Sequence, residues 1–243
     1  MDLASPVFWL ALGQIIWINI ILSGDNAVVI ALAARSLPPK QQKQAIIWGS
    51  GAAVVLRILL TLVAALLLNL PYLQIIGGLL LLYIGVQLLA EEEEEEGETK
   101  VYGTMMAAVR TILIADLVMS LDNVIAVALA AKIDGVVNYP LLIIGLAISI
   151  PLVVFGSTLI IKLMERFPVI IVLGAALIGW VAGDAMTHDV AIKDLFAGNQ
   201  AIAYGVKIGC AVLVIVIGKW LSSRSAKNHA EAESPPMEQK SGG

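Results

Sequence analysis

Seven apolar runs of membrane-spanning length dominate this chain of 243 residues and restrict it to one broad class of fold. A helix of about 20 apolar residues is long enough to cross the hydrocarbon core of a bilayer. The runs are Val7 to Ala34, Ala45 to Leu68, Tyr72 to Ala90, Tyr102 to Ala131, Tyr139 to Met164, Val169 to Met186 and Ala201 to Leu221. Charged residues make up only 14% of the chain, against roughly 25% in soluble domains. The sequence therefore predicts an all-α, polytopic membrane protein.

The chain divides into one transmembrane domain over residues 1–221 and a polar tail over residues 222–243. Ser, Pro, Glu and Lys dominate the tail, a composition typical of disordered segments. Six glutamates, Glu91 to Glu96, follow the third apolar run. We expect them to form a solvated loop, with concentration of cations at a cytoplasmic mouth as the alternative. The net charge of −4 includes this run and gives no indication of nucleic-acid binding.

Lys and Arg residues fall unequally on the two sides of the predicted bundle. Ten of them lie on the side reached after the first, third, fifth and seventh runs, and three lie on the opposite side. The cytoplasmic loops of membrane proteins carry an excess of positive charge. We therefore expect a multi-pass protein of the plasma membrane, with its amino terminus outside and its carboxyl terminus in the cytoplasm.

A shift of 97 residues superimposes the first half of the chain on the second. Ser23-Gly24-Asp25-Asn26 falls on Ser120-Leu121-Asp122-Asn123, and seven of the twelve positions from Ser23 are identical. Residues 7–90 and 102–187 thus form two predicted units of three helices, and residues 201–221 form a seventh helix. Because three crossings are an odd number, the second unit would enter the membrane from the opposite side. This is the inverted repeat found in secondary transporters.

Polar side chains recur at helical spacing in both copies of the motif. They stand at positions i, i+4 and i+7, as Asn19, Ser23 and Asn26 and again as Asp116, Ser120 and Asn123. Each of the two helices is therefore expected to carry one polar face. Asp25 and Asp122 lie about 100° from that face on an ideal helix, so either the pocket is wide or the helix unwinds there. Gly24 favours unwinding in the first copy, whereas Leu121 gives no such freedom in the second.

An ionisable side chain at membrane depth is costly, and a duplicated one predicts a functional site. The candidate metal ligands are all oxygen donors, namely Asp25, Asn26, Asp116, Asp122, Asn123 and Asp184. The residues expected to support them are Asn19, Ser23, Arg57 and Ser120. Carboxylate and carbonyl oxygens suit Mg, Ca and Mn, whereas Zn and Cu sites usually recruit His or Cys. The sequence thus favours a divalent cation as substrate, exchanged for protons that relieve the excess negative charge.

The same motifs carry a family resemblance. The run Ser-Gly-Asp-Asn-Ala-Val-Val-Ile-Ala-Leu-Ala from Ser23 and the run Ala-Asp-Leu-Val-Met-Ser-Leu-Asp-Asn-Val from Ala115 resemble the paired signatures of the TerC family, in its shorter YjbE-like branch. The resemblance implies membership of the wider LysE-type transporter group. It also implies export of Mn²⁺ as the transported ion, with no resident cofactor. By motif match, Asp25, Asn26, Asp122 and Asn123 would bind the ion, and Asp116 would be the acidic residue before the second motif.

Several of these residues have a structural interpretation as well. The motif residues could serve only to hold neighbouring helices together by hydrogen bonds. Asp184 lies near the end of its apolar run, where a solvated helix terminus explains it equally well. Arg57 is expected to be a structural counter-ion to one of the aspartates rather than a substrate contact.

Three other functions compete with the transporter. An intramembrane aspartyl protease also needs two aspartates close enough to share a proton. Here Asn follows each motif aspartate, and neither a Gly-x-Gly-Asp nor a Pro-Ala-Leu motif occurs, so we expect no enzymatic activity. An amino-acid exporter of LysE type stays open and would need Arg57 to hold the carboxylate. A non-transporting membrane partner that senses or delivers metal also stays open, as does a homodimer.

Overall fold

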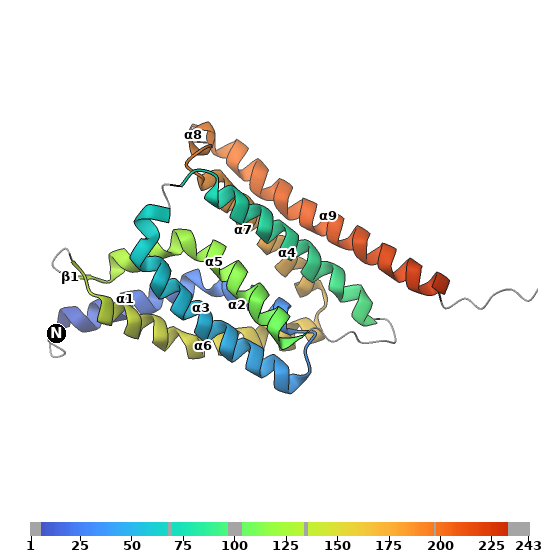
Figure 1. Ribbon diagram of the computed structural model, residues 1–243, viewed down its shortest axis with the longest axis horizontal. Coiled ribbons are helices and arrows are strands. Elements are labelled where there is room, and N and C mark those ends of the chain that lie inside the picture. The colour runs from blue at the N-terminus through green and yellow to red at the C-terminus, as the bar shows by residue number, and fades with distance from the viewer. Residues whose placement is uncertain (1–5, 68–69, 97–103, 134–135, 197, 233–243) are drawn as a thin grey trace, which may run out of the picture.

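The computed structural model describes residues 6–67, 70–96, 104–133, 136–196 and 198–232, and for some of these, including Glu91 to Glu96, Asp122 and residues 225–232, it describes the backbone alone. The helices are α1 (Pro6–Leu22), α2 (Gly24–Ala34), α3 (Pro39–Leu67), α4 (Leu73–Glu96), α5 (Met105–Ala130), α6 (Tyr139–Arg166), α7 (Val169–His188), α8 (Lys193–Phe196) and α9 (Gln200–Ala232) (Figure 1). Two-residue strands, β1 (Lys132–Ile133) and β2 (Val136–Val137), form an antiparallel pair between α5 and α6. The predicted helical class is therefore confirmed, with this small hairpin as the addition.

The first apolar run is broken at its polar motif. α1 ends at Leu22 and α2 begins at Gly24, and the two helices are bent by 50°. The side-chain amide of Asn26 spans the break and donates a hydrogen bond of 3.1 Å to the carbonyl of Leu22. α5 passes through the second motif without interruption. The break therefore occurs in the copy that carries glycine, because glycine tolerates a departure from helical geometry more readily than leucine does.

Five helices in the described residues, α3, α4, α6, α7 and α9, are long and apolar enough to cross a membrane. The bent α1–α2 pair makes a sixth if it counts as one span. α5 has a comparable length, but Arg110, Asp116 and Asp122 lie along it. A multi-pass architecture of five or six candidate spans is thus confirmed, whereas the seventh span and the inverted repeat stay predictions.

Two predicted boundaries are wrong. α4 continues through Glu91 to Glu96, which we expected to form a loop. α9 continues to Ala232, so the first part of the tail expected from residue 222 is helical, and residues 233–243 lie outside the described residues. Both extensions are rich in Glu, Ala or Lys, which are good helix formers in water. Loss of hydropathy ends a membrane span but does not end a helix.

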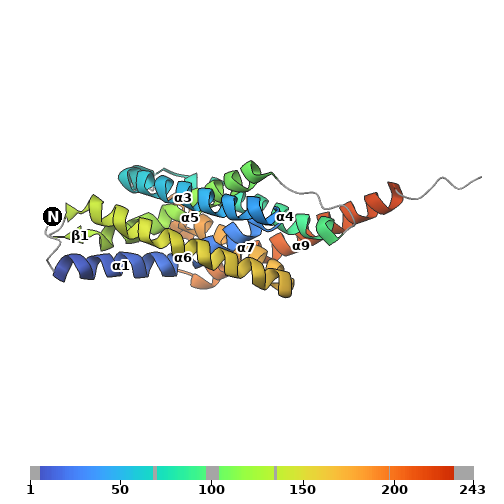
Figure 2. The ribbon, with the colours of Figure 1, turned by 90° about the horizontal axis from the view of Figure 1, so that it is seen from below.

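Helices from the two halves of the chain pack against each other. α3 packs against α5, while α6 packs against α1 and α2. Phe8 near the start of α1 shares a buried cluster with Val127 near the end of α5, so these two helices run antiparallel. α4 lies along α7, and α9 packs on both of them. Figure 1 shows α4, α7 and α9 as a group beside the remaining long helices, and Figure 2 shows the end of α9 extending beyond the other helices.

Asp189 joins the end of α7 to the start of α4. Its carboxylate is fully buried and accepts hydrogen bonds from the backbone N–H groups of Tyr72, Gln74 and Ile75 at 2.9 to 3.2 Å. The N–H of Ala191 donates a further bond of 2.8 Å. The first N–H groups of a helix have no intrahelical acceptor, and a carboxylate there satisfies them. Asp189 thus fixes α4 antiparallel to α7.

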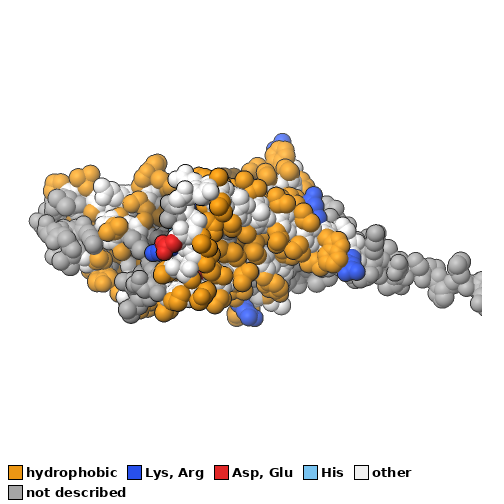
Figure 3. Space-filling model, turned by 90° about the horizontal axis from the view of Figure 1, so that it is seen from above, with side chains coloured by type: hydrophobic (Ala, Val, Ile, Leu, Met, Phe, Trp, Pro, Cys, Tyr) orange, Lys and Arg blue, Asp and Glu red, His pale blue; other side chains and the backbone are white. Residues whose placement is uncertain are grey.

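α7 approaches α9 closely because of two glycines one turn apart. A Cβ atom on Gly179 would lie 2.7 Å from the carbonyl oxygen of Cys210, and one on Gly183 would lie 2.8 Å from the Cα of Lys207. Small residues at a spacing of four allow helix backbones to meet inside membranes. The outer face of α9 is apolar and exposed, with Ile208, Val212 and Val216 on it. Figure 3 shows a broad hydrophobic surface with few charged side chains on this side of the molecule.

Candidate functional site

Arg57 of α3 is the centre of a buried polar cluster. Its Nη2 donates to Oδ1 of Asp116 at 2.6 Å, its Nη1 donates to Oδ1 of Asn19 at 2.8 Å, and its Nε donates to Oγ of Ser120 at 3.0 Å. The hydroxyl of Ser23 donates to the same Asn19 oxygen at 3.4 Å. One guanidinium group therefore joins α1, α3 and α5.

The partners of Arg57 occupy equivalent positions in the two halves of the sequence. Asn19 falls on Asp116 at a shift of 97 residues, and Ser23 falls on Ser120. The structure brings both pairs into one hydrogen-bonded cluster. The polar faces expected from helical spacing therefore meet, at least over these four positions.

The cluster is almost completely shielded from solvent. Asn19 is 1% exposed, Arg57 is 4% exposed and Asp116 is 6% exposed. Inside a low-dielectric bundle such an ion pair persists only when hydrogen bonds satisfy both charged groups. Oδ1 of Asp116 is satisfied by Arg57, but its Oδ2 is buried and has no hydrogen-bond partner among the described residues. Asp116 thus retains one acceptor oxygen for another donor or for a cation.

The first motif presents a second oxygen of this kind. Asn26 is buried, and its Oδ1 has no hydrogen-bond partner among the described residues. Asp25 is half-buried, and its Oδ1 accepts the backbone N–H of Asn26 at 2.8 Å in the first turn of α2. A helix amino terminus stabilises a carboxylate in this position. Asp25 and Asn26 therefore stand at the break between α1 and α2.

The second motif lies in the continuous helix α5. Asn123 is half-buried, whereas the side chain of Asp122 lies outside the described residues. No group of three His, Cys, Asp or Glu side chains that could hold a metal ion occurs among the side chains that the structure describes. A cation site built from these residues would therefore combine carboxylates with amide and backbone oxygens.

Asp184 is separate from this cluster. It forms an ion pair with Lys207 of α9 and lies 3.8 Å from Nδ1 of His188, and neither residue belongs to the cluster around Arg57. Lys207 also lies over the rings of Trp180 and Tyr204. These contacts place Asp184 in the packing between α7 and α9, and the structure does not bring it together with the other candidate ligands.

Sequence reasoning missed the role of Asp189. The residue follows a predicted span and resembles any polar loop residue, and its backbone partners lie 114 to 117 positions earlier in the chain. Its burial and three of its four N–H donors appear only when α4 and α7 are packed. The available signal of a tight turn there was Pro71. It precedes Tyr72, which has a φ of 67° and is the one non-glycine residue with positive φ among the described residues.

Comparison with known proteins gives a match over most of the chain. The model of the integral membrane protein TerC family matches residues 4–226. The uncharacterized membrane protein YjbE of Bacillus subtilis (strain 168) is 46% identical over 209 residues, covering 86% of this chain and 94% of YjbE. The uncharacterized membrane protein YkoY of the same organism is 29% identical over 191 residues, covering 72% of this chain and 59% of YkoY. The UPF0053 inner membrane protein YoaE of Escherichia coli (strain K12) is 28% identical over 191 residues, or 36% of its own length. No solved structure matches this chain.

Proposed function

This chain belongs to the TerC family of integral membrane proteins, and from that premise we propose that it is a transporter that exports divalent metal cations, with Mn²⁺ as its main substrate, from the cytoplasm. The observation that carries the proposal is the meeting of polar residues from both halves of the chain on Arg57. Secondary transporters place their substrate sites near the midplane, between two repeats, and often at a broken helix. The break between α1 and α2 lies at the first motif.

The charge at the site favours a cation as substrate. The charge of Arg57 is paired with Asp116, and the two motifs add two further carboxylates to the sequence, Asp25 and Asp122. Carboxylates at membrane depth require a counter-charge. A divalent cation would provide it, and protons would provide it after the cation has left, which couples export to proton uptake in this proposal.

The donor chemistry favours Mn²⁺ and other hard cations. The buried oxygens without partners among the described residues include Oδ1 of Asn26 and Oδ2 of Asp116. Asp25 and Asp122 add carboxylates, and Asn123 adds an amide oxygen. Oxygen ligands of this kind suit Mn, Mg and Ca. The proposal assigns Asp25 and Asp122 as principal ligands and gives no residue a catalytic role.

The engagement of Arg57 weakens the amino-acid exporter as an alternative. A zwitterionic substrate would need a fork of two guanidinium N–H groups for its carboxylate. In the structure three of the five N–H groups of Arg57 already donate, each to a different partner, and the residue is 4% exposed. A non-transporting partner that senses or delivers metal remains the second candidate, because binding of metal alone would explain the same oxygens.

The transporter hypothesis is tested by manganese accumulation in bacterial cells that lack their own manganese exporters. Expression of the parent chain is expected to lower intracellular manganese, whereas Asp25→Asn and Asp122→Asn each abolish most of the effect. Asp194→Asn is the matched control, since Asp194 is exposed on the short helix α8. Membrane levels of all variants are compared by immunoblot.

Purified protein in liposomes separates a carrier from a binding partner. Export predicts movement of Mn²⁺ across the liposome membrane, driven by an opposing pH gradient. Binding of Mn²⁺ without movement would support the non-transporting partner. Motif variants that lower cellular manganese as well as the parent does would show that the assigned ligands are wrong.

A further inference from the structure

We propose that α2, α4 and α5 enclose a vestibule through which the divalent cation passes from the cytoplasm toward the two motifs. The inference rests on the proposed transport function and adds to it a route and a set of residues. A cavity of about 60 Å³ lies between these three helices, which is enough for a few water molecules. None of its lining residues belongs to the motifs or to the cluster around Arg57.

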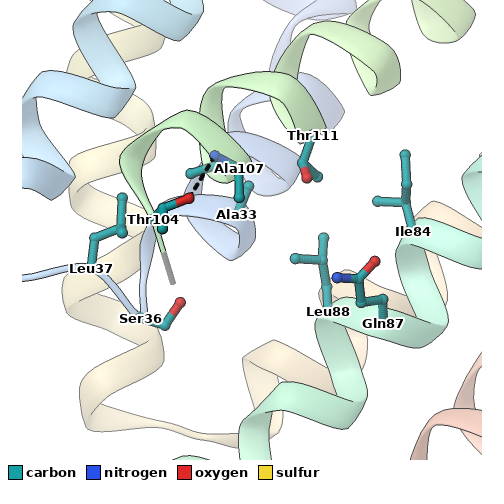
Figure 4. Close-up of a pocket in the computed structure, with 10 residues that line it drawn as sticks. Ala33, Ser36, Leu37, Ile84, Gln87, Leu88, Thr104, Ala107 and Thr111 are labelled. Atoms are coloured by element: carbon teal, nitrogen blue, oxygen red, sulfur yellow. Dashed lines mark hydrogen bonds between the residues drawn. The ribbon is translucent and has the colours of Figure 1, made fainter. Parts of the chain in front are cut away.

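Neutral oxygen-bearing side chains line this cavity from three elements. Ser36 lies in the turn after α2, Gln87 lies on α4, and Thr111 lies on α5, and Figure 4 shows all three directed toward the same space. Thr104 also lines it, with its hydroxyl oxygen accepting the N–H of Ala107 at 3.2 Å. Hydroxyl and amide oxygens can replace part of the water shell of a hard cation without binding it tightly.

Small side chains keep the cavity open. Ala33 of α2 and both Ala107 and Ala108 of α5 form part of the lining. Ala33 follows Asn26 by seven residues on α2, and Thr111 precedes Asp122 by eleven residues on α5. At about 100° per residue, the two positions of each pair are therefore only about 20° apart around the helix axis. The cavity therefore lies on the helix faces that carry the motif positions. Along α5, Thr111 and Asp122 are about 16 Å apart at a rise of 1.5 Å per residue.

Val118 closes the route between the cavity and the second motif. It precedes Asp122 by four residues on the same face of α5, and it is buried. It packs on Gly77 of α4, where a Cβ atom would lie only 2.8 Å from Cγ1 of Val118. The cavity thus ends at a packed contact between α4 and α5, as expected of a transporter conformation with the central site shut off from this side.

The charge pattern places the vestibule on the cytoplasmic side. Ser36 follows Arg35 directly, and Lys40 and Lys43 lie near the start of α3, on the side that the positive-inside rule assigns to the cytoplasm. Gln87 stands one helical turn before Glu91, the first of six consecutive glutamates. Acidic residues near a mouth raise the local concentration of cations.

Cysteine labelling tests the vestibule directly. Thr111→Cys is made in a Cys210→Ser background, since Cys210 is the single cysteine of the chain. A membrane-impermeant, quaternary-ammonium methanethiosulfonate is added to right-side-out or inside-out vesicles. The matched control is Leu117→Cys on the same helix, where the side chain is exposed on the apolar surface. We expect labelling from the cytoplasmic side to be at least about tenfold faster at Thr111→Cys, because a thiol facing lipid stays protonated and unreactive. Millimolar Mn²⁺ is expected to slow that labelling.

Three outcomes would each overturn the vestibule. They are labelling of Thr111→Cys no faster than Leu117→Cys, faster labelling from the outside, and labelling that Mn²⁺ leaves unchanged. The vestibule and the transporter can fail separately. A parent chain that exports manganese while Thr111→Cys stays unlabelled rejects the vestibule alone, whereas a parent that exports no manganese rejects the transporter whatever the labelling.

Discussion

Arg57 brings a positive charge into an apolar bundle, and Asp116 meets it with a hydrogen bond of 2.6 Å. The sequence placed Arg57 among the apolar residues of the second run and predicted a structural counter-ion to one of the aspartates, and Asp116 is its ion-pair partner in the structure. It did not indicate which aspartate would be the partner, because that depends on how α3 and α5 pack. Since Asn19 and Ser120 share the same guanidinium, the pair also aligns the two polar faces.

Loss of one partner of this buried pair is expected to cost more than loss of both. Arg57→Met leaves Asp116 charged or forces it to take a proton, and Asp116→Asn leaves a buried guanidinium without its carboxylate. Removing one partner of a buried ion pair typically costs about 3–5 kcal/mol. Thermal unfolding in detergent should therefore show each single variant well below the parent, with the double variant recovering part of the loss. Additive losses in the double-mutant cycle would show that the two charges do not depend on each other.

Asp189 predicts a pH dependence of stability. Burial alone would raise its pKa, but the N–H groups of Ala191, Tyr72, Ile75 and Gln74 outweigh that effect and lower the pKa of Asp189 below its ordinary value. A carboxylate with a lowered pKa in the folded state stabilises the protein above its unfolded pKa of about 3.9. That contribution is lost as the pH falls through the lower, folded value.

Asp189→Asn should therefore destabilise the protein by about 1–3 kcal/mol at pH 7, since an amide cannot accept with two oxygens. The difference in melting temperature from the parent is expected to shrink as the pH is lowered from 7 to 3. Asp194→Asn serves as the exposed control and should follow the parent throughout. An equal difference at both ends of the pH range would exclude the charge of Asp189 as the cause.

At the scale of helices, the closeness of α7 and α9 depends on glycine. Gly179→Ala would place a Cβ atom 2.7 Å from the backbone of both Cys210 and Ala211, so α9 would have to shift. Gly205→Ala on α9 is the matched control, because a Cβ atom there meets nothing within 4 Å. Alanine is the better helix former by about 1 kcal/mol, so Gly205→Ala should leave the melting temperature unchanged or raise it. Gly179→Ala should lower it, and equal behaviour of the two variants would contradict the close contact.

The sequence predicted most of the helices but not all of their ends. Hydropathy located the spans because it measures transfer into the bilayer. Gly24 indicated where the first apolar run breaks, because glycine gives the backbone freedom at that polar motif. Leu121 gives no such freedom, and α5 is continuous there. The predicted ends of α4 and α9 were wrong because the helices continue beyond the apolar runs, through Glu91 to Glu96 in α4 and through the residues after Leu221 in α9. Helix propensity, rather than hydropathy, governs those ends.

At the scale of the whole molecule, packing connects the two halves of the chain. α3 lies on α5, and its counterpart α6 lies on α1 and α2, the counterparts of α5. The 97-residue shift predicted which helices correspond, but it could not predict that each half would pack on the other. Alternating access in such an arrangement requires contacts between the halves to open and close. The contact between Gly77 of α4 and Val118 of α5 is one of them.

A disulfide at this contact should lock the proposed transporter. A Cβ atom on Gly77 would lie 3.5 Å from the Cβ of Val118, within the range of about 3.5–4.5 Å that a disulfide requires. In a Cys210→Ser background, Gly77→Cys combined with Val118→Cys is expected to stop Mn²⁺ movement in liposomes after oxidation and to recover it after reduction. Each single cysteine variant should be insensitive to both treatments. Full transport by the oxidised double variant, with the crosslink verified by mass spectrometry, would mean that α4 and α5 keep this contact throughout the cycle and that the cation takes another route.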